Sequence, residues 1–327
     1  MSRKGRLFQR LTLGRGVPNA SQASNIRGFK LGGFMFNCFN DDFSAVPLDR
    51  EPRKFGHQLT RHPAVSLENI SRLILAHPKN KVVYSKGLLK NGDDFENAQH
   101  EHGNGLSIEE TIETIRVSNS YIYVVSPELD PSFRELHREL VGDVEQVMKQ
   151  QGLGNTAIDT SLHLFIASPS AFTPFHIDRY STILMQARGS KEVCIFPSWD
   201  ERVVSAPDRE QYLAYSKTKL PWAPEMDAHA TRFDFSPGEA VHIPFVAGHY
   251  VRNGSEDVSI SLSITFNTNQ SMAWRRTIAF NRVARPHLQK LGTSPTPVGV
   301  SPWRDAAKAG TWAKAAVLSR SLQRQKA

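Results

Sequence analysis

Thr173-Pro-Phe-His-Ile-Asp178, followed much later in the chain by Gly248-His-Tyr-Val251, is the part of the sequence that decides the fold. His176 and Asp178 are two residues apart, so on a β-strand their side chains would point to the same face of the sheet. A second histidine, His249, can reach them only from another strand. Two imidazoles and one carboxylate form a ligand set that suits iron(II) and leaves coordination positions open. We therefore expect these three residues to meet.

The sequence around these residues has the residue pattern of short β-strands. Val258-Ser-Ile-Ser-Leu-Ser-Ile-Thr-Phe266 alternates apolar and small polar residues, which is typical of a strand. Gly, Pro, Ser and Asp turn signals separate this run from others of similar length. Many short strands at such spacing favour a double-sheet jelly roll of the cupin kind. The predicted strands are residues 162–167, 181–187, 192–196, 232–235, 239–243, 249–252 and 258–268.

Helical patterns flank this β-rich region. On the N-terminal side, Ser66 begins a helix with one apolar face, Ser107 and Glu110 form a capping-box pattern, and Asp130-Pro131 is an N-cap and N1 pair. On the C-terminal side we expect helices at 272–284, 303–308 and 312–323, with the Pro-rich stretch 293–302 as a linker.

The expected fold class is mainly β with flanking helices (α+β), built on a double-stranded β-helix core. Four parts follow along the chain. They are a basic flexible arm (1–30), an N-terminal helix and strand lead-in packed on the barrel (31–160), the double-stranded β-helix (161–268) and a basic helical C-terminal extension (269–327).

The composition is that of an ordinary globular protein, with 39% hydrophobic and 22% charged residues. Cys38 and Cys194 lie far apart without the spacing of a zinc knuckle, which fits a reducing compartment. No apolar run is long enough to span a membrane, and the basic N-terminus lacks the apolar run of a signal peptide. We expect a cytoplasmic protein without a membrane partner.

The net charge of +8 is concentrated at one end. Residues 271–327 contain eleven Lys and Arg against one acid, Asp305. Such a tail could contact nucleic acid or another acidic partner, but the sequence favours a solvated helical surface, because no recognised nucleic-acid fold accompanies it. The C-terminal helices carry Trp303, Trp312 and Leu318 and could pack on the barrel or on a second subunit, so a homo-oligomer is possible.

The order of motifs resembles the jumonji-C (JmjC) and cupin-like family of iron(II)- and 2-oxoglutarate-dependent oxygenases, in particular its asparaginyl-hydroxylase branch. The resemblance runs from about Thr173 to Phe266, and Glu239 stands where members usually carry Asp. The turn Phe245-Val-Ala-Gly248 also replaces a bulky aromatic turn. The motifs that carry the resemblance are Thr173-Pro-Phe-His-Ile-Asp178, Gly189-Ser-Lys-Glu-Val-Cys-Ile-Phe-Pro197, Pro237-Gly-Glu-Ala-Val-His-Ile-Pro244 and His249-Tyr-Val251.

The resemblance implies that His176, Asp178 and His249 are the catalytic metal ligands. Lys191 takes the position of the cation that pairs with the far carboxylate of 2-oxoglutarate. Thr173 would donate its hydroxyl to the same carboxylate from a neighbouring predicted strand. The alternative for Lys191 is a solvated lysine in a Gly-Ser-Lys turn.

Further positions are implied less specifically. Tyr123, or in its place Tyr121, would touch the co-substrate, although a structural aromatic fits the pattern equally well. Thr182 and Ser263 would line the pocket.

Three other histidines need an assignment. His242 competes with His249 as the third ligand, and the order of proline, turn and histidine in the family favours His249. His163 and His229 are predicted to be structural.

The activity implied is that of a dioxygenase that uses Fe(II), 2-oxoglutarate and O2 to hydroxylate a C–H bond, with release of succinate and CO2. A peptide, a protein side chain or a small molecule could be the substrate, and demethylation is less favoured because no reader domain or zinc module accompanies the barrel. Two alternatives are a non-catalytic cupin-like metal-binding or regulatory protein, and a cupin that holds zinc or manganese.

Overall fold

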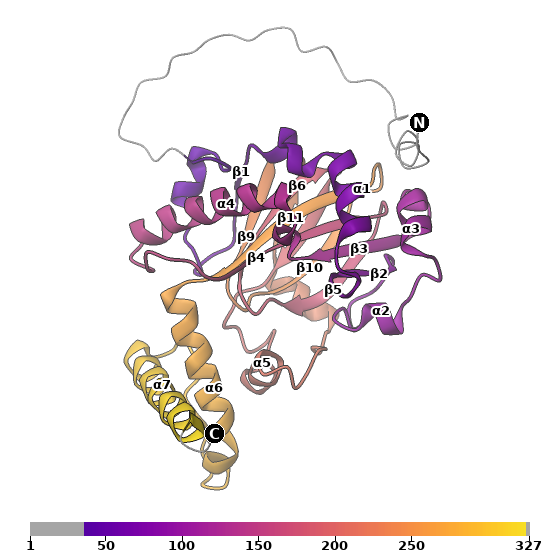
Figure 1. Ribbon diagram of the computed structural model, residues 1–327. Coiled ribbons are helices and arrows are strands. Elements are labelled where there is room, and N and C mark those ends of the chain that lie inside the picture. The colour runs from indigo at the N-terminus through magenta and orange to yellow at the C-terminus, as the bar shows by residue number, and fades with distance from the viewer. Residues whose placement is uncertain (1–35, 325–327) are drawn as a thin grey trace.

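Two antiparallel β-sheets face each other in the computed structural model, which describes residues 36–324 (Figure 1). The larger sheet has the strand order β1-β9-β6-β11-β4-β3-β2, and the smaller has the order β5-β10-β7-β8. From β4 to β11 the chain crosses between the sheets at nearly every step, which is the connectivity of a jelly roll. The predicted fold class is confirmed, whereas the predicted arm at residues 1–30 lies outside the described residues.

The seven predicted strands lie close to β4 and β6 to β11, β5 was not among them, and three more strands precede β4. The strands are β1 (Arg53–Gly56), β2 (Val82–Lys86), β3 (Ser120–Val125), β4 (Ile158–Ala167), β5 (Phe172–Ile177), β6 (Ser181–Arg188), β7 (Lys191–Ile195), β8 (Thr231–Phe235), β9 (Glu239–Ile243), β10 (Gly248–Asn253) and β11 (Ser259–Asn267).

Strand β11 lies at the centre of the larger sheet, between β4 and β6, and all nine of its residues are buried. Its apolar residues face the outer helices, where Leu262 and Ile264 join the main core. Its small polar residues face the opposite sheet, where Ser263 and Thr265 line a cavity. The alternation read from the sequence therefore marks a strand buried on both faces, with a polar face toward the cavity.

The longer helices of the lead-in cover the outer face of the larger sheet (Figure 1). Helix α1 (Leu67–Ala76) begins at the N-cap Ser66, and α3 (Ile108–Thr114) begins with the predicted capping box of Ser107 and Glu110. The short α2 (Ala98–Glu101) lies between them in the chain. Helix α4 (Pro131–Gln150) begins at its N-cap Asp130 and buries an apolar face against the sheet.

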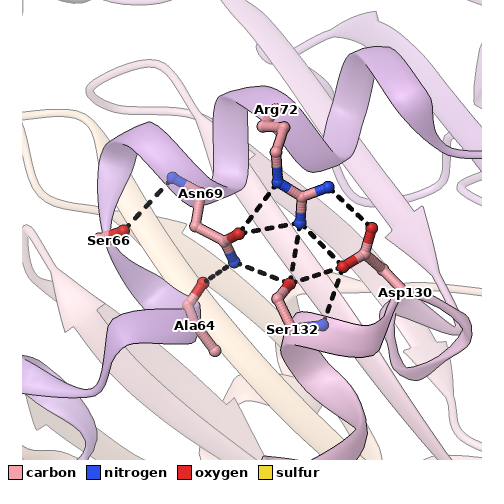
Figure 2. A network of polar contacts seen from close by, with 6 residues as sticks. All are labelled: Ala64, Ser66, Asn69, Arg72, Asp130 and Ser132. Atoms are coloured by element: carbon pink, nitrogen blue, oxygen red, sulfur yellow. Dashed lines mark hydrogen bonds and ion pairs between the residues drawn. The ribbon is translucent and has the colours of Figure 1, made fainter.

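A polar network ties α1 to the start of α4 (Figure 2). The Arg72 guanidinium donates to both Asp130 carboxylate oxygens, at 2.9 and 2.8 Å. Asp130 also accepts from the Ser132 backbone N–H at 2.9 Å, as an N-cap does. These donors hold the pKa of Asp130 well below its usual value, with the Arg72 hydrogen bond the largest cause. The network fixes two helices that bury the outer face of the sheet.

The C-terminal part contains α5 (Ala206–Leu213), α6 (Asn269–Gln289) and α7 (Pro302–Arg324). The prediction of separate helices at 303–308 and 312–323 was wrong, because α7 runs without a break through Gly310. A Cβ at Gly310 would meet no other atom within 4 Å, so this glycine is not required by packing. Short 3-10 helices lie at Asp41–Ala45, Leu59–Arg61, Pro63–Val65, Lys79–Lys81, Pro127–Leu129 and Pro224–His229.

Candidate metal centre and its pocket

The three predicted ligands come together between the two sheets. His176 on β5 and His249 on β10 are register partners, with ring centroids 4.2 Å apart, and Asp178 directly follows β5. The Nε2 atoms of His176 and His249 each lie 3.9 Å from an Asp178 carboxylate oxygen. One ligand atom from each of the three residues lies within 4.8 Å of the others. The arrangement suits a metal ion.

Backbone carbonyls fix the orientation of both imidazoles. His176 Nδ1 lies 2.7 Å from the Pro174 carbonyl oxygen, and His249 Nδ1 lies 3.0 Å from that of Ala247. A carbonyl can only accept, so each Nδ1 carries the proton and each Nε2 presents a lone pair toward Asp178. Metal-binding histidines are typically oriented in this way by a second partner.

Burial and mutual contact keep this group ready to bind a cation. Burial, with the facing His249, lowers the pKa of His176 to about 4, so its imidazole is neutral near pH 7. Burial alone would raise the pKa of Asp178, but His249, His176 and a hydrogen bond from Thr182 bring it below its usual value. The site therefore presents the neutral His176 imidazole and the Asp178 carboxylate beside His249, as metal binding requires.

The triad opens into a cavity of about 320 Å³ between the sheets. The larger sheet supplies one wall, with Tyr121, Tyr123 and Phe165, and the smaller sheet supplies the other, with the ligands, Thr173 and Lys191. Every site residue predicted from the sequence lines this cavity.

Lys191 is buried in the cavity rather than solvated in a turn. It is the first residue of β7, its side chain is 5% exposed, and burial lowers its pKa to about 7. Among the residues that the structure describes, none forms a hydrogen bond or ion pair with its ammonium group. A buried cation without a partner costs free energy unless a ligand supplies the counter-charge.

Thr173 and Tyr121 lie on the same cavity as Lys191. A side-chain hydrogen bond joins Tyr121 to Thr173, and burial raises the pKa of Tyr121. We expected Thr173 to lie on a strand next to that of Lys191. This was wrong, because β10 separates β5 from β7. Both residues still line the cavity, where Val251 of β10 lies opposite Thr173 in the register.

Tyr123 lies two residues after Tyr121 on β3 and has a different hydrogen-bond partner. Its hydroxyl is 2.8 Å from His163 Nδ1, and His163 Nε2 is 3.3 Å from Thr265 Oγ1. Thr265 donates its own proton to the Ser161 carbonyl, so the neutral His163 donates through Nε2 and accepts from Tyr123. Burial lowers the pKa of His163 to about 4. His163, predicted to be structural, therefore lines the cavity as part of a polar chain.

Thr182 has a direct role at the triad. Its hydroxyl donates to Asp178 Oδ2 at 2.6 Å, which holds the carboxylate in place. Ser263 lines the cavity from β11 and is 2% exposed.

His242 and His229 do not reach the triad. His242 on β9 is fully buried and lies 3.2 Å from the Glu51 carbonyl, on the face of the sheet opposite to Ile243, which lines the cavity. His229 ends a 3-10 helix and does not line the cavity. His249, rather than His242, is the histidine that meets His176 and Asp178.

Sequence reasoning missed the residues at the cavity mouth. Phe95 lies with its ring centroid 5.1 Å from that of His176. The neighbouring Glu96 accepts from Arg179 at 2.5 and 3.3 Å. The Arg179 guanidinium also lies between the rings of Tyr212 and Tyr215, at 4.3 and 4.0 Å from their centroids. The position of Arg179, directly after a predicted ligand, was the available signal.

A family model described as a cupin-like domain matches residues 71–272, more than half of the chain. No curated protein sequence matches this chain. Among solved structures, ycfD from Escherichia coli is 11% identical with a TM-score of 0.42, over 83% of this chain and 63% of that one. A complex of that E. coli ribosomal oxygenase with cobalt and 2-oxoglutarate is 13% identical, with a TM-score of 0.40 over 80% and 59% of the two chains.

An oxalate decarboxylase from Bacillus subtilis is 19% identical with a TM-score of 0.24, over 34% of this chain and 22% of that one. The present chain thus spans less than two thirds of each of these structures. Likenesses this weak carry no argument about the site or its chemistry. In the part of the chain that the structure describes, no helix is both long and apolar enough to cross a bilayer.

Proposed function

We propose that this chain, which belongs to the cupin-like domain family, is an Fe(II)- and 2-oxoglutarate-dependent dioxygenase that hydroxylates a C–H bond. The observation that carries the proposal is the pairing of two features in one cavity: a metal-ligand triad and a buried ammonium group that has no counter-charge among the described residues. A dicarboxylate bound between them satisfies both.

The residues present fit iron(II). Two imidazoles and one carboxylate match the facial set of non-haem iron oxygenases, and three protein ligands leave positions for a 2-oxo acid and dioxygen. When bound, iron would supply the activation of dioxygen, with succinate and CO2 as co-products. Zinc and manganese also accept such ligands, so metal analysis belongs in the test.

Lys191 would hold the far carboxylate of 2-oxoglutarate. Its ammonium is buried, and the anion would restore its ordinary protonation by supplying the missing charge. The hydroxyl groups of Thr173 and Tyr121 are joined by a hydrogen bond on the same cavity and would complete the carboxylate contacts.

The rest of the cavity would orient the substrate and exclude water. Phe95 covers His176, and the ion pair of Glu96 with Arg179 holds its segment against the turn that follows the triad. The aromatic groups Tyr212 and Tyr215 frame the mouth. These walls accept a peptide, a protein side chain or a small molecule, and the substrate class is left open.

The test is succinate formation by protein prepared without metal. Iron(II), 2-oxoglutarate and oxygen should give uncoupled turnover to succinate even without substrate, and zinc or manganese should not replace iron. His176→Ala should abolish turnover, whereas His229→Ala is the matched histidine control and should leave it unchanged. The proposal fails if the protein binds no 2-oxoglutarate, or if His176→Ala behaves as the wild type.

A further inference from the structure

Helices α6 and α7 form a hairpin (residues 269–324) that extends away from both sheets (Figure 1). The two helices pack on each other, and the Thr277 hydroxyl donates to the Asp305 carbonyl at 2.9 Å across their contact. Arg285 joins the hairpin to α5 by donating to Glu210 at 2.6 and 2.7 Å, and Arg275 donates to the Arg179 carbonyl at 2.8 Å. The hairpin is therefore a rigid projection with most of its outer surface free.

Every exposed charged side chain described on this hairpin is a cation. The single acid, Asp305, is 7% exposed and accepts from the Gly299 backbone N–H at 2.9 Å. Three other cations already donate hydrogen bonds within the protein. They are Arg275, to the Arg179 carbonyl, Arg285, to the Glu210 carboxylate, and Lys308, to the Thr296 carbonyl. The other cations of the hairpin whose side chains are described are exposed and form no ion pair among the described residues, although Arg304 also donates to Thr296 Oγ1 at 3.0 Å. These five, called the free cations below, are Arg276, Arg282, Lys290, Arg304 and Lys314.

An exposed aromatic platform lies beside one of the free cations, Arg304. The Trp303 indole is 70% exposed, and the Arg304 guanidinium lies 5.1 Å from its centroid. On the same face of α7 the exposed Ala307 and Gly310 add little bulk before Lys314. The face thus presents an aromatic ring, a shallow stretch and a cation.

We propose that the hairpin binds single-stranded nucleic acid. The free cations would contact successive phosphates, and a base would stack on Trp303. Cations that track a backbone, combined with aromatic stacking platforms, are how proteins bind single strands without sequence preference. This function is independent of the proposed chemistry in the barrel.

Two other occupants fit the surface less well. A second copy, related by a two-fold axis, would bring the same cations of both hairpins together, and like charges oppose this contact. A bilayer would have to accept Lys314 in the middle of the face that carries Trp303 and Val317. Neither of these costs arises with a polyphosphate strand.

The test is fluorescence anisotropy of a labelled oligo-uridine strand titrated with the full chain at several KCl concentrations. If about four cations contact phosphates, log K falls with log salt with a slope of about −2.8, so binding weakens about fifty-fold from roughly 50 to 200 mM KCl. Half-saturation above about 100 μM at the lowest salt would overturn the proposal.

Two triple variants separate this surface from general charge. Arg282→Ser with Lys290→Ser and Lys314→Ser should reduce the slope to about −0.7, as expected when three phosphate contacts are lost. The matched control replaces three exposed cations outside the hairpin, without ion pairs among the described residues, and should change the slope little. It combines Lys79→Ser, Arg134→Ser and Lys149→Ser. Unchanged 2-oxoglutarate binding and melting temperature show that both variants are folded.

Trp303→Ala should weaken binding about tenfold, and Trp303→Phe should restore most of it, because either ring can stack on a base. Equal loss in both triple variants overturns the proposal. So does tighter binding to vesicles with phosphatidylserine than to RNA, or equal binding to polyglutamate with no effect of Trp303→Ala. A dimer in light scattering that only the hairpin variant dissociates would instead make this surface a self-interface.

Discussion

Replacing Lys191 by methionine should stabilise the ligand-free protein and abolish 2-oxoglutarate binding. The lysine is buried without a counter-charge, so the folded state must either desolvate an ammonium group or release its proton. Methionine fills similar space with a straight apolar chain and removes this cost. The same substitution removes the only cation proposed to hold the far carboxylate.

The magnitude follows from the shift in pKa. Burial lowers the pKa of Lys191 from 10.5 to about 7. A shift of this size corresponds to about 5 kcal/mol, because one pKa unit is about 1.4 kcal/mol. Replacing a buried charge by a well-packed apolar group stabilises proteins by about 1–4 kcal/mol. We therefore expect a gain of about 2–4 kcal/mol near pH 7.

The gain should depend on pH with a definite sign. Between about pH 7 and 10.5 the unfolded chain holds a proton at this lysine that the folded chain has released, so wild-type stability rises with pH. The advantage of the methionine variant is therefore largest at pH 7 and below, and it shrinks as the pH approaches 10.

The assay is urea unfolding of metal-free protein at pH 7 and pH 9, with calorimetry of 2-oxoglutarate binding under argon in the presence of Fe(II). Lys149→Met, at an exposed lysine of α4, is the control and should change stability by less than about 0.5 kcal/mol. A loss of stability in Lys191→Met would refute the burial argument, and unchanged affinity for 2-oxoglutarate would refute the assigned role.

Three further variants probe the cavity and the scaffold. Tyr121→Phe should weaken 2-oxoglutarate binding about tenfold in calorimetry, because a hydrogen bond to a charged group contributes about 1.5–3 kcal/mol, whereas Tyr123→Phe should change it little. Equal effects would contradict this assignment. Thr182→Val should weaken metal binding about 10–100-fold in a chelator competition, because Asp178 loses its hydrogen bond; wild-type affinity would show that the bond does not position the ligand. Asp130→Ala should lower the free energy of unfolding by about 1–2 kcal/mol at pH 7 and by less at pH 3. Because folding lowers the pKa of Asp130, its contribution to stability is fully present above the pKa that Asp130 has in the unfolded chain, and it is lost as the pH falls below that value. Urea titrations at both pH values check this, and an equal loss at both would contradict it.

Local signals in the sequence were sufficient for much of the fold. Ser66, Ser107 and Asp130 each begin the helix that their capping patterns predict, because a cap depends on residues within one turn. The alternation of residues 258–266 likewise identified β11, because side chains of a strand alternate between its faces. The triad was found through the spacing of His176 and Asp178, the order of the surrounding motifs and the family that this order resembles.

Features set by distant contacts were not readable in this way. The sequence predicted two separate helices at 303–308 and 312–323, yet α7 continues through Gly310 because its packing along α6 outweighs the low helix propensity of one glycine. Phe95 and Glu96 lie in a polar loop whose place beside the triad depends on Arg179, far away in the chain. The separation of β5 and β7 by β10 is likewise a property of the sheet, not of either strand.

The charges of the cavity imply that metal and co-substrate bind cooperatively. Asp178 and Lys191 are the cavity charges not already paired within the described protein, because Glu96 neutralises Arg179. A divalent cation alone, or a dicarboxylate alone, would leave a net buried charge, whereas both together with Asp178 and Lys191 sum to zero. Buried charges are tolerated when compensated, so each ligand should lower the cost of the other, and the coupling must be reciprocal. Calorimetry should show at least about tenfold tighter 2-oxoglutarate binding with Fe(II) than without, and the same factor for Fe(II) with 2-oxoglutarate. Independent binding of the two ligands would show that the cavity is not the shared site of both.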